Sequence, residues 1–382
     1  MDHTTRYRRL IERYVDGDLS RRDFLAVLGA AGVACGVVGG PMRMLARHAH
    51  AAAGRIRYDG WGGTVDKAVT EFALDPFTKR TGIQVDRGSY GGMDEFLTKV
   101  KASTPGEHHV FLCLDQFNYK RFSDLGYATE LDESKIPNLK NCAPATVDLF
   151  RKLSGGRLSG VPYVYGVSVW AYNTKRVDGA YVEKAGVNAL VDPKFKGKIA
   201  GDMSWAQRIW WAALQANQNP NEIRDMNAVW DKIRQSKELV LKYYSSGAEQ
   251  MSLLANEEMW LGDAWAGRVA VLQRQGHPLK TVVAPGARTF VGPMYVLKGA
   301  PMDAAHALLN FMLEPEAAVA VSKAMAYPTA LDPTRFKLPD EITSLPGFDP
   351  TGKFSTVTFE DPVYWSKNAL EWQRQFQRIV TR

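Results

Sequence analysis

The 382-residue sequence has only three cysteines and lacks the short motifs that mark common enzyme and metal sites. No CxxC, HExxH, GxSxG or GxGxxG occurs. His108 and His109 are adjacent, but no second cluster of metal ligands lies near them in sequence, and we interpret them as part of a solvated turn before a strand. The sequence therefore predicts no catalytic residue, no metal and no cofactor.

The sparse cysteines also exclude a disulfide-rich scaffold. Cys35 lies in an N-terminal segment discussed below, which leaves Cys113 and Cys142 in the body of the chain. Cys113 lies in HVFLCLDQF, an apolar run typical of a buried strand, so we expect a buried free thiol there. A disulfide between Cys113 and Cys142 stays open at this point.

A strong excess of basic charge is missing as well. Residues 52–382 carry 40 basic and 36 acidic residues, and the basic ones are scattered, with no run rich in lysine and arginine. This pattern argues against a nucleic-acid partner. With 45% apolar residues, the chain has enough material for two domains with cores of their own.

No apolar run is long enough to predict a membrane-spanning helix. The stretch from Phe24 to Gly40 is shorter than the roughly 20 residues that span a bilayer, and glycines dilute it. A basic segment precedes it, and the small residues of 49–53 follow it. This order predicts a signal peptide over residues 1–51, with the mature chain beginning near Ala52 or Gly54.

The segment SRRDFL, with Arg21 and Arg22, resembles the twin-arginine signal, which directs folded proteins across the bacterial inner membrane. We therefore expect the twin-arginine export machinery as a partner and the periplasm as the location. Two alternatives stay open, an uncleaved anchor helix and a lipoprotein signal that ends at Cys35.

Short strands and helices alternate in the first part of the mature chain. We expect strands near 56–58, 83–90 and 108–114, and helices over 65–81 and 91–103. Such alternation predicts a parallel sheet covered by helices. Ligands bind beyond the carboxyl ends of the strands in such sheets, here at 61–63 and 89–92.

The second part begins with a long extended stretch over 158–174, which we expect to run from one domain into another. A strand near Ile199, a helix over 209–214 and a strand at Tyr243 and Tyr244 follow. We further expect a strand and a helix within 257–276, a strand over 290–301 that returns to the first domain, and two helices broken at Glu314-Pro315.

The order of these pieces resembles the extracellular solute-binding proteins of ABC importers, and among them the spermidine/putrescine-binding group. The matching stretches, in the family's order, are FTKRTGIQV, GVPYVYGVSVWAYNTKRV, DPKFKGKIA, LGDAWAGRVAVLQRQG, AAHALLNFML and AMAYPTALDPTR. The resemblance implies an α/β, two-lobed type II periplasmic-binding-protein fold, each lobe a sheet flanked by helices, with the ligand in the interlobe cleft.

The resemblance also implies boundaries and partners. Lobe 1 is expected to comprise 55–165 and 290–335, and lobe 2 to comprise 166–289 and 336–382. The implied partners are a small-molecule ligand and a membrane permease of the importer. The protein is expected to act as a monomer, and an enzyme exported by the twin-arginine route is the competing class.

Five aromatic residues match positions that hold the ligand in the family, namely Trp61, Tyr90, Trp265, Phe290 and Tyr327. Together they form a candidate aromatic box for the ligand's alkyl chain and cationic end. Each of them alone fits ordinary core packing equally well.

The acidic residues that pair with amines in polyamine binders are missing. The loop 202–208 places Trp205 and Arg208 near those positions, and the returning strand offers Gly292. A desolvated Arg208 would repel a polyamine and pair instead with a carboxylate or phosphonate. Asp263 lies two residues before Trp265, on the same face of a strand. It is a candidate partner for an amine, and a structural carboxylate of the lobe is the equal alternative.

These residues favour an amino-acid-like or phosphonate-like zwitterion as the ligand, with Arg208 at the anion and Asp263 at the amine. A true polyamine is the alternative. Candidate ligand residues are Trp61, Tyr90, Trp205, Arg208, Asp263, Trp265, Phe290 and Tyr327.

Overall fold

The computed structural model describes residues 54–354 and 357–381. The predicted signal peptide, with Arg21, Arg22 and Cys35, lies outside these ranges. Among the described helices, none combines the length and the apolar character needed to cross a bilayer.

The ten strands of the described residues form one sheet. They are β1 (Arg55–Gly60), β2 (Gln84–Ser89), β3 (Val110–Leu112), β4 (Gly160–Asn173), β5 (Ile199–Asp202), β6 (Val240–Tyr244), β7 (Leu261–Trp265), β8 (Leu279–Val282), β9 (Arg288–Val296) and β10 (Thr358–Phe359). The order is β2-β1-β3-β9-β4-β7-β5-β6, while β8 pairs with β4 and β10 with β9. β1 runs parallel to β2 and β3, which confirms the predicted parallel sheet.

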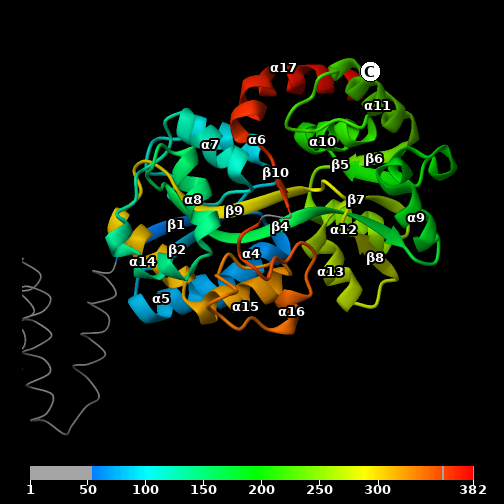
Figure 1. Ribbon diagram of the computed structural model, residues 1–382. Coiled ribbons are helices and arrows are strands. Elements are labelled where there is room, and N and C mark those ends of the chain that lie inside the picture. The colour runs from blue at the N-terminus through cyan, green and yellow to red at the C-terminus, as the bar shows by residue number, and fades with distance from the viewer. Residues whose placement is uncertain (1–53, 355–356, 382) are drawn as a thin grey trace, which may run out of the picture. The chain divides into compact units, whose positions relative to one another are not determined.

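Helices lie above and below the strands in Figure 1. The α-helices are α4 (Gly63–Val69), α5 (Asp75–Thr81), α6 (Met93–Ala102), α7 (Gln116–Asp124), α8 (Pro144–Leu153), α9 (Gly179–Ala185), α10 (Trp205–Gln215), α11 (Met226–Leu239), α12 (Gly247–Ala255), α13 (Ala266–Arg274), α14 (Met302–Met312), α15 (Pro315–Met325), α16 (Asp340–Thr343) and α17 (Pro362–Val380). A π-helical turn, Thr70–Leu74, joins α4 to α5, and 3₁₀ turns lie at Glu133–Lys135, Pro137–Asn141, Gly186–Val191 and Pro193–Phe195.

The predicted helix over 65–81 is confirmed as the run from α4 through the π turn to α5. Its apolar side chains, Val65 and Phe77 among them, are buried. Gly82 follows at φ 78°, and its N–H donates to the Thr78 carbonyl. Glycine is favoured there because a left-handed residue closes a helix without a clash of its side chain.

β4 connects the two halves of the structure, as the long extended stretch predicted. Residues 160–167 of β4 pair with β9, and 168–173 pair with β7 and β8. Figure 1 shows β4 and β9 running through the middle, between β1 and β2 on one side and β5, β6 and β7 on the other. The residues of β4 are buried on both faces, which explains their nearly continuous apolar run.

Each half has a hydrophobic core of its own, and we call these halves lobe 1 and lobe 2. The core of lobe 1 comes mainly from residues 56–165 and 291–327. The core of lobe 2 comes mainly from residues 167–287 and 365–379, with Phe117 added from α7. α17 packs against α10 and α11 and also against α7, so the C-terminal helix touches both lobes.

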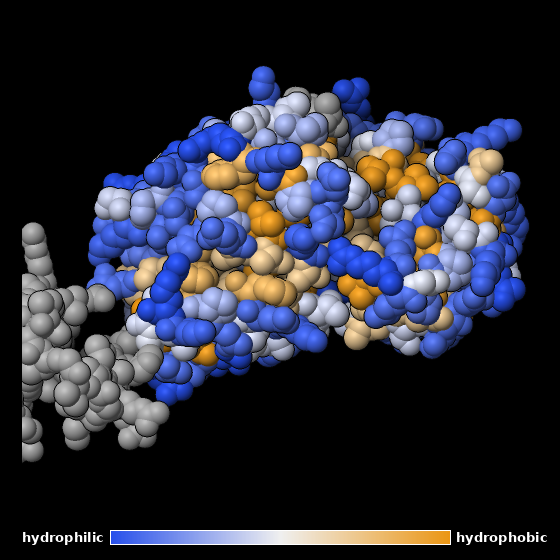
Figure 2. Space-filling model, turned by 90° about the horizontal axis from the view of Figure 1, so that it is seen from below, coloured by the Kyte–Doolittle hydropathy of each residue, from blue (hydrophilic) through white to orange (hydrophobic). Residues whose placement is uncertain are grey.

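The face below the sheet, where α5, α15, α16 and α13 lie, shows apolar patches among hydrophilic residues (Figure 2). A groove on this side is lined by α13 residues such as Ala270 and Arg274, by Thr281 of β8, and by Glu341 and residues 344–346.

Both cysteines of the described chain are free and buried. The expectation for Cys113 is therefore confirmed, and the open question of a bond to Cys142 is answered. Burial raises the pKa of both thiols, that of Cys142 to about 12.

Candidate ligand-binding site

Three of the predicted aromatic residues form one cluster beside the crossing strands. Trp61 follows β1, Phe290 lies in β9, and Tyr327 follows α15. Their ring centroids lie 5.8–6.4 Å apart in edge-to-face arrangements. This geometry is favourable for aromatic rings, because the positive edge of one meets the negative face of another. We call this group the aromatic cluster.

The aromatic cluster packs directly against two glycine residues, Gly166 and Gly267. A Cβ on Gly166 would lie 2.8 Å from Phe290 Cζ and 2.9 Å from Tyr327 Cδ1. A Cβ on Gly267 would lie 2.5 Å from Tyr327 Cε2. Gly166 belongs to β4 and Gly267 to α13 of lobe 2, so the cluster reaches both lobes.

Tyr90 lies apart from this cluster, in the core of lobe 1. Its hydroxyl donates to the Leu112 carbonyl, and its ring stacks on Phe96 at 4.7 Å. The Trp61 indole N–H donates to the same carbonyl at 2.7 Å, so Leu112 links the two residues. Burial raises the pKa of Tyr90 well above its ordinary value, which keeps the hydroxyl protonated.

Trp205 begins α10, where the Ser204 side chain caps the helix. Its ring meets Phe117 of α7 and Trp365 of α17, each at 6.0 Å. Trp205 therefore packs between α7, α10 and α17 and not against the aromatic cluster.

Trp265 is the last residue of β7 and contacts the end of β5. Its indole N–H donates to Asp202 Oδ2 at 3.1 Å, and its ring meets Tyr244 edge to face at 5.6 Å. The Asp202 N–H donates to Asp263 Oδ2 at 3.3 Å. Asp263 and Trp265 thus share a neighbour, as expected for two residues on one face of a strand.

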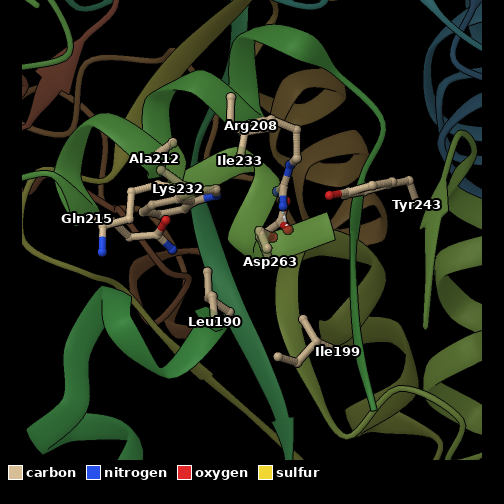
Figure 3. A pocket seen from close by; sticks show the side chains of 11 residues that line it. Leu190, Ile199, Arg208, Ala212, Gln215, Lys232, Ile233, Tyr243 and Asp263 are labelled. Carbon is tan, nitrogen blue, oxygen red and sulfur yellow. Dashed lines mark ion pairs between the residues drawn. The ribbon is translucent and has the colours of Figure 1, made fainter. Parts of the chain in front are cut away.

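Arg208 and Asp263 form an ion pair between α10 and β7 (Figure 3). Both are buried, and the ring of Tyr243 lies 5.9 Å from the guanidinium carbon. Burial raises the pKa of Asp263 to about 6, and the positive charge of Arg208 opposes that rise. A narrow cavity beside the pair is lined by Leu190, Ala212, Lys232 and other residues of lobe 2.

This pairing differs from the expectation that Arg208 and Asp263 hold opposite ends of a ligand. Arg208 is the fourth residue of α10, and the first turn of this helix lies beside β7. The two side chains therefore neutralise each other. Their roles toward a ligand, like those of the other six predicted residues, stay predictions.

Sequence reasoning missed a third group, which joins the lobes. Arg268, in the first turn of α13, donates from Nη1 to Thr64 Oγ1 of α4 at 2.6 Å. Asp66 lies two residues further along α4, and burial raises its pKa to about 6, while Arg268 opposes that rise. The sequence feature that could have indicated Arg268 is its position, since it follows the carboxyl end of a predicted strand and lies three residues after Trp265.

The expectation of a solvated histidine turn is wrong for His108. This side chain is buried, and its Nδ1 lies 2.8 Å from Asp59 Oδ2. His109 Nδ1 accepts the Arg57 N–H at 2.8 Å. The polar partners come from the neighbouring strand β1, which sequence spacing alone does not reveal. The described residues contain no group of three or more possible metal ligands.

Known proteins share this architecture. The spermidine/putrescine-binding periplasmic protein 1 of Haemophilus influenzae is 26% identical over 289 residues, which cover 74% of this chain and 78% of the relative. The solved substrate-binding protein PotD of a spermidine/putrescine ABC transporter from Streptococcus pneumoniae superposes with a TM-score of 0.67 at 20% identity, covering 85% of this chain and 99% of its own.

A second solved structure is the periplasmic binding protein AgtB from Agrobacterium tumefaciens R10, in complex with agropinic acid. Its TM-score is 0.71 at 18% identity, with 86% of this chain and 100% of the other covered. These likenesses confirm the two-lobed α/β fold of the periplasmic binding proteins. The relatives are substrate-binding components of transporters and not enzymes.

The profile of the bacterial extracellular solute-binding proteins matches residues 73–349. The matched segment covers most of lobe 1, both crossing strands and most of lobe 2. It includes Phe290, Tyr327 and the Arg208–Asp263 pair, whereas β1 and Trp61 precede it. The chain therefore belongs to the family of bacterial extracellular solute-binding proteins.

Proposed function

We propose that this protein is the periplasmic substrate-binding component of an ABC importer of the polyamine-like type. It captures a small organic solute and delivers it to a membrane permease, and it works as a monomer without a cofactor. The family match and the relatives that are named as spermidine/putrescine-binding periplasmic proteins support this assignment.

We further propose that the solute is a small zwitterion with one anionic end, a short aliphatic body and one amine. The observation that carries this proposal is the engagement of the carboxylates at the ends of β5 and β7. Asp263 is paired with Arg208, and Asp202 accepts from the Trp265 indole and from the Ser204 N–H. A solute with two or three ammonium groups finds no free carboxylate on this wall, and each unpaired ammonium would be costly to bury.

The aromatic cluster suits the aliphatic body of such a solute. Trp61 and Phe290 are only partly buried, so parts of their rings remain open to a ligand. Apolar and aromatic walls with a few fixed polar groups are the usual lining of small-molecule sites. The solved relative with bound agropinic acid shows that this fold accommodates an acid.

A true polyamine is the second candidate, and one observation besides the relatives' names favours it. Asp66 Oδ1 is buried without a hydrogen-bond partner, so one carboxylate oxygen of lobe 1 remains to be satisfied. An amine that reaches Asp66 would be attracted to it at neutral pH.

A ligand screen by thermal shift and calorimetry tests the proposal. The panel contains ω-amino acids, aminoalkylphosphonates, simple organic acids, putrescine and spermidine. A single-site ligand at about 100 times its Kd adds about 2.7 kcal/mol of stability, which a melting curve resolves. We expect the zwitterions to stabilise the protein most.

Analysis of the purified protein for a bound cofactor or metal distinguishes a binding protein from an exported enzyme. Visible absorption and metal analysis of protein prepared from the periplasm report any resident cofactor or metal. Tight binding of putrescine or spermidine with no response to acids would replace the zwitterion by a polyamine. A stoichiometric cofactor with no response to any solute of the panel would contradict the transport function.

A further inference from the structure

Three arginines are buried in the described chain, and one of them has no carboxylate partner. Arg208 pairs with Asp263, and Arg288 pairs with Asp115 and Glu360. Arg268 is 6% exposed, and within residues 54–354 and 357–381 no acidic oxygen lies within 4.0 Å of it. The molecule therefore satisfies the charge of the first two internally and that of Arg268 only in part.

A buried guanidinium without a counter-ion is costly. Removal of a cation from water is repaid only when an anion or several hydrogen bonds replace the water. The hydrogen bond of Arg268 goes to the hydroxyl of Thr64, a neutral acceptor. Asp66 lies on the same helix as Thr64, and the charge of Arg268 acts on it, but the two side chains form no ion pair within 4.0 Å.

The surroundings of Arg268 are those expected of a ligand contact. It follows the carboxyl end of β7, where ligands bind in α/β folds. The preceding residue, Gly267, packs against the ring of Tyr327, and the guanidinium itself lies against Gly247 at the start of α12. The positive charge of Arg268 opposes the rise that burial causes in the pKa of Tyr327. Arg268 belongs to lobe 2 and Thr64 to lobe 1, so their hydrogen bond spans the two lobes.

Among residues 54–354 and 357–381, the hydroxyl of Thr64 has one hydrogen-bond partner, Arg268. Its oxygen accepts from Arg268, which leaves its own hydrogen available for donation. A carboxylate or phosphonate oxygen beside the pair would thus receive hydrogen bonds from both Arg268 and Thr64. A planar guanidinium also presents two parallel N–H groups, which match the two oxygens of a carboxylate.

We infer that Arg268, assisted by Thr64 of the opposite lobe, binds the anionic group of the transported solute. The inference rests on the proposed function and assigns the anion to a residue outside the eight predicted ones. A solute anion that contacts Arg268 and Thr64 together holds the two lobes in contact, so recognition of the anion and closure of the lobes become one event.

Calorimetry on matched ligands tests this assignment in the mature protein. The ligands are ω-amino acids of three to six carbons, the corresponding ω-amino amides, diamines of equal length and aminoalkylphosphonates. The variants are Arg268→Gln, Arg268→Lys and Thr64→Val, with Arg274→Gln as the control. Arg274 lies on the same helix and also reaches lobe 1, by donating to the Lys323 carbonyl, but it is exposed.

We expect the wild type to bind the best acid on the order of a hundredfold more tightly than its amide. Arg268→Gln should abolish that preference while it leaves the melting temperature of the free protein unchanged or higher, because a buried unpaired charge is removed. Arg268→Lys should keep part of the preference, since the charge remains and the planar fork is lost. Thr64→Val should weaken acid binding, and Arg274→Gln should not.

The outcomes separate the two proposals. Equal binding of acid and amide by the wild type, or acid binding by Arg268→Gln that matches the wild type, would overturn the role of Arg268 and leave the transport function in place. Loss of acid binding in Arg208→Gln under conditions where that variant is folded, together with retained acid binding in Arg268→Gln, would return that role to Arg208. Failure of the wild type to bind any ligand of either panel would overturn the proposed function itself.

Discussion

Arg208 of α10 and Asp263 of β7 neutralise each other in the interior of lobe 2, although 54 residues separate them in the chain. Because of this pairing, Asp263 is not a free carboxylate at the end of β7. The pairing also makes the stability of lobe 2 depend on both partners.

Substitution of Arg208 by Ala should destabilise the protein by about 3–5 kcal/mol at pH 7, because Asp263 then stays buried without a counter-ion. Urea unfolding followed by circular dichroism measures the change. Arg234→Gln is the control, since Arg234 forms an exposed pair with Asp231 and such pairs contribute little.

The loss in Arg208→Ala should shrink at acid pH. Burial raises the folded-state pKa of Asp263 and Arg208 opposes that rise, so in the variant this pKa lies above its wild-type value of about 6. The protonated form is favoured in the folded state, and the stability that it contributes is lost as pH rises toward this folded-state pKa. The double variant Arg208→Ala with Asp263→Asn should recover part of the stability at pH 7. A deficit equal at pH 5 and pH 8 would contradict this explanation.

Glu360 should make a second pH-dependent contribution to stability. It lies where the C-terminal segment contacts β9. It is buried beside Arg288, and burial raises its pKa to about 7, against the effect of Arg288. An acid with a raised folded pKa stabilises most below its unfolded pKa and loses that contribution as pH rises through the folded value. The melting temperature of the wild type should therefore fall relative to Glu360→Gln between pH 5 and pH 8. Parallel curves would show that Glu360 titrates normally.

Trp61 and Tyr90 should respond differently to substitution, although both donate to the Leu112 carbonyl. Trp61→Leu removes a ring of the aromatic cluster and should weaken binding of the solute about tenfold. Tyr90→Phe keeps the ring stacked on Phe96 and should cost about 1 kcal/mol of stability for the lost hydrogen bond, with the affinity unchanged. Calorimetry and urea unfolding measure the two effects, and an affinity loss in Tyr90→Phe would place Tyr90 among the ligand contacts.

The two buried thiols should be unreactive in the native mature protein. Thiolates, not thiols, react with disulfide reagents, and burial raises the pKa of Cys142 to about 12. Titration with a chromogenic disulfide reagent should count no thiol before denaturation and two after it. A count of zero in denaturant without reductant would indicate a disulfide between Cys113 and Cys142.

Export should depend on the paired arginines of the N-terminal segment. Replacement of both Arg21 and Arg22 by Lys should abolish transport to the periplasm, and the mature protein should begin near Ala52 or Gly54. Cell fractionation and mass spectrometry of the periplasmic protein test both statements. Retention of Phe24 would refute cleavage, and lipid on an N-terminal Cys35 would establish the lipoprotein alternative.

The order and type of the main elements follow from local patterns in the sequence. The continuous apolar run of β4 predicted a crossing strand, Pro315 predicted the break between α14 and α15, and Gly82 predicted the end of α5. These signals are local, because burial on both faces of a strand and the backbone limits of proline and glycine act within a few residues.

The partners of the charged side chains were decided by the tertiary structure alone. The sequence predicted a solvated turn at His108, but this side chain is buried and contacts Asp59. The sequence also predicted that Arg208 binds an anion of the ligand, but Arg208 forms an ion pair with Asp263. Arg268 gave no signal beyond its place after a strand, yet of the three buried arginines in the described part of the chain it is the one without an acidic partner. Sequence periodicity reports which face of an element is buried, whereas the cost of a buried charge depends on atoms that the fold brings together from distant strands and helices.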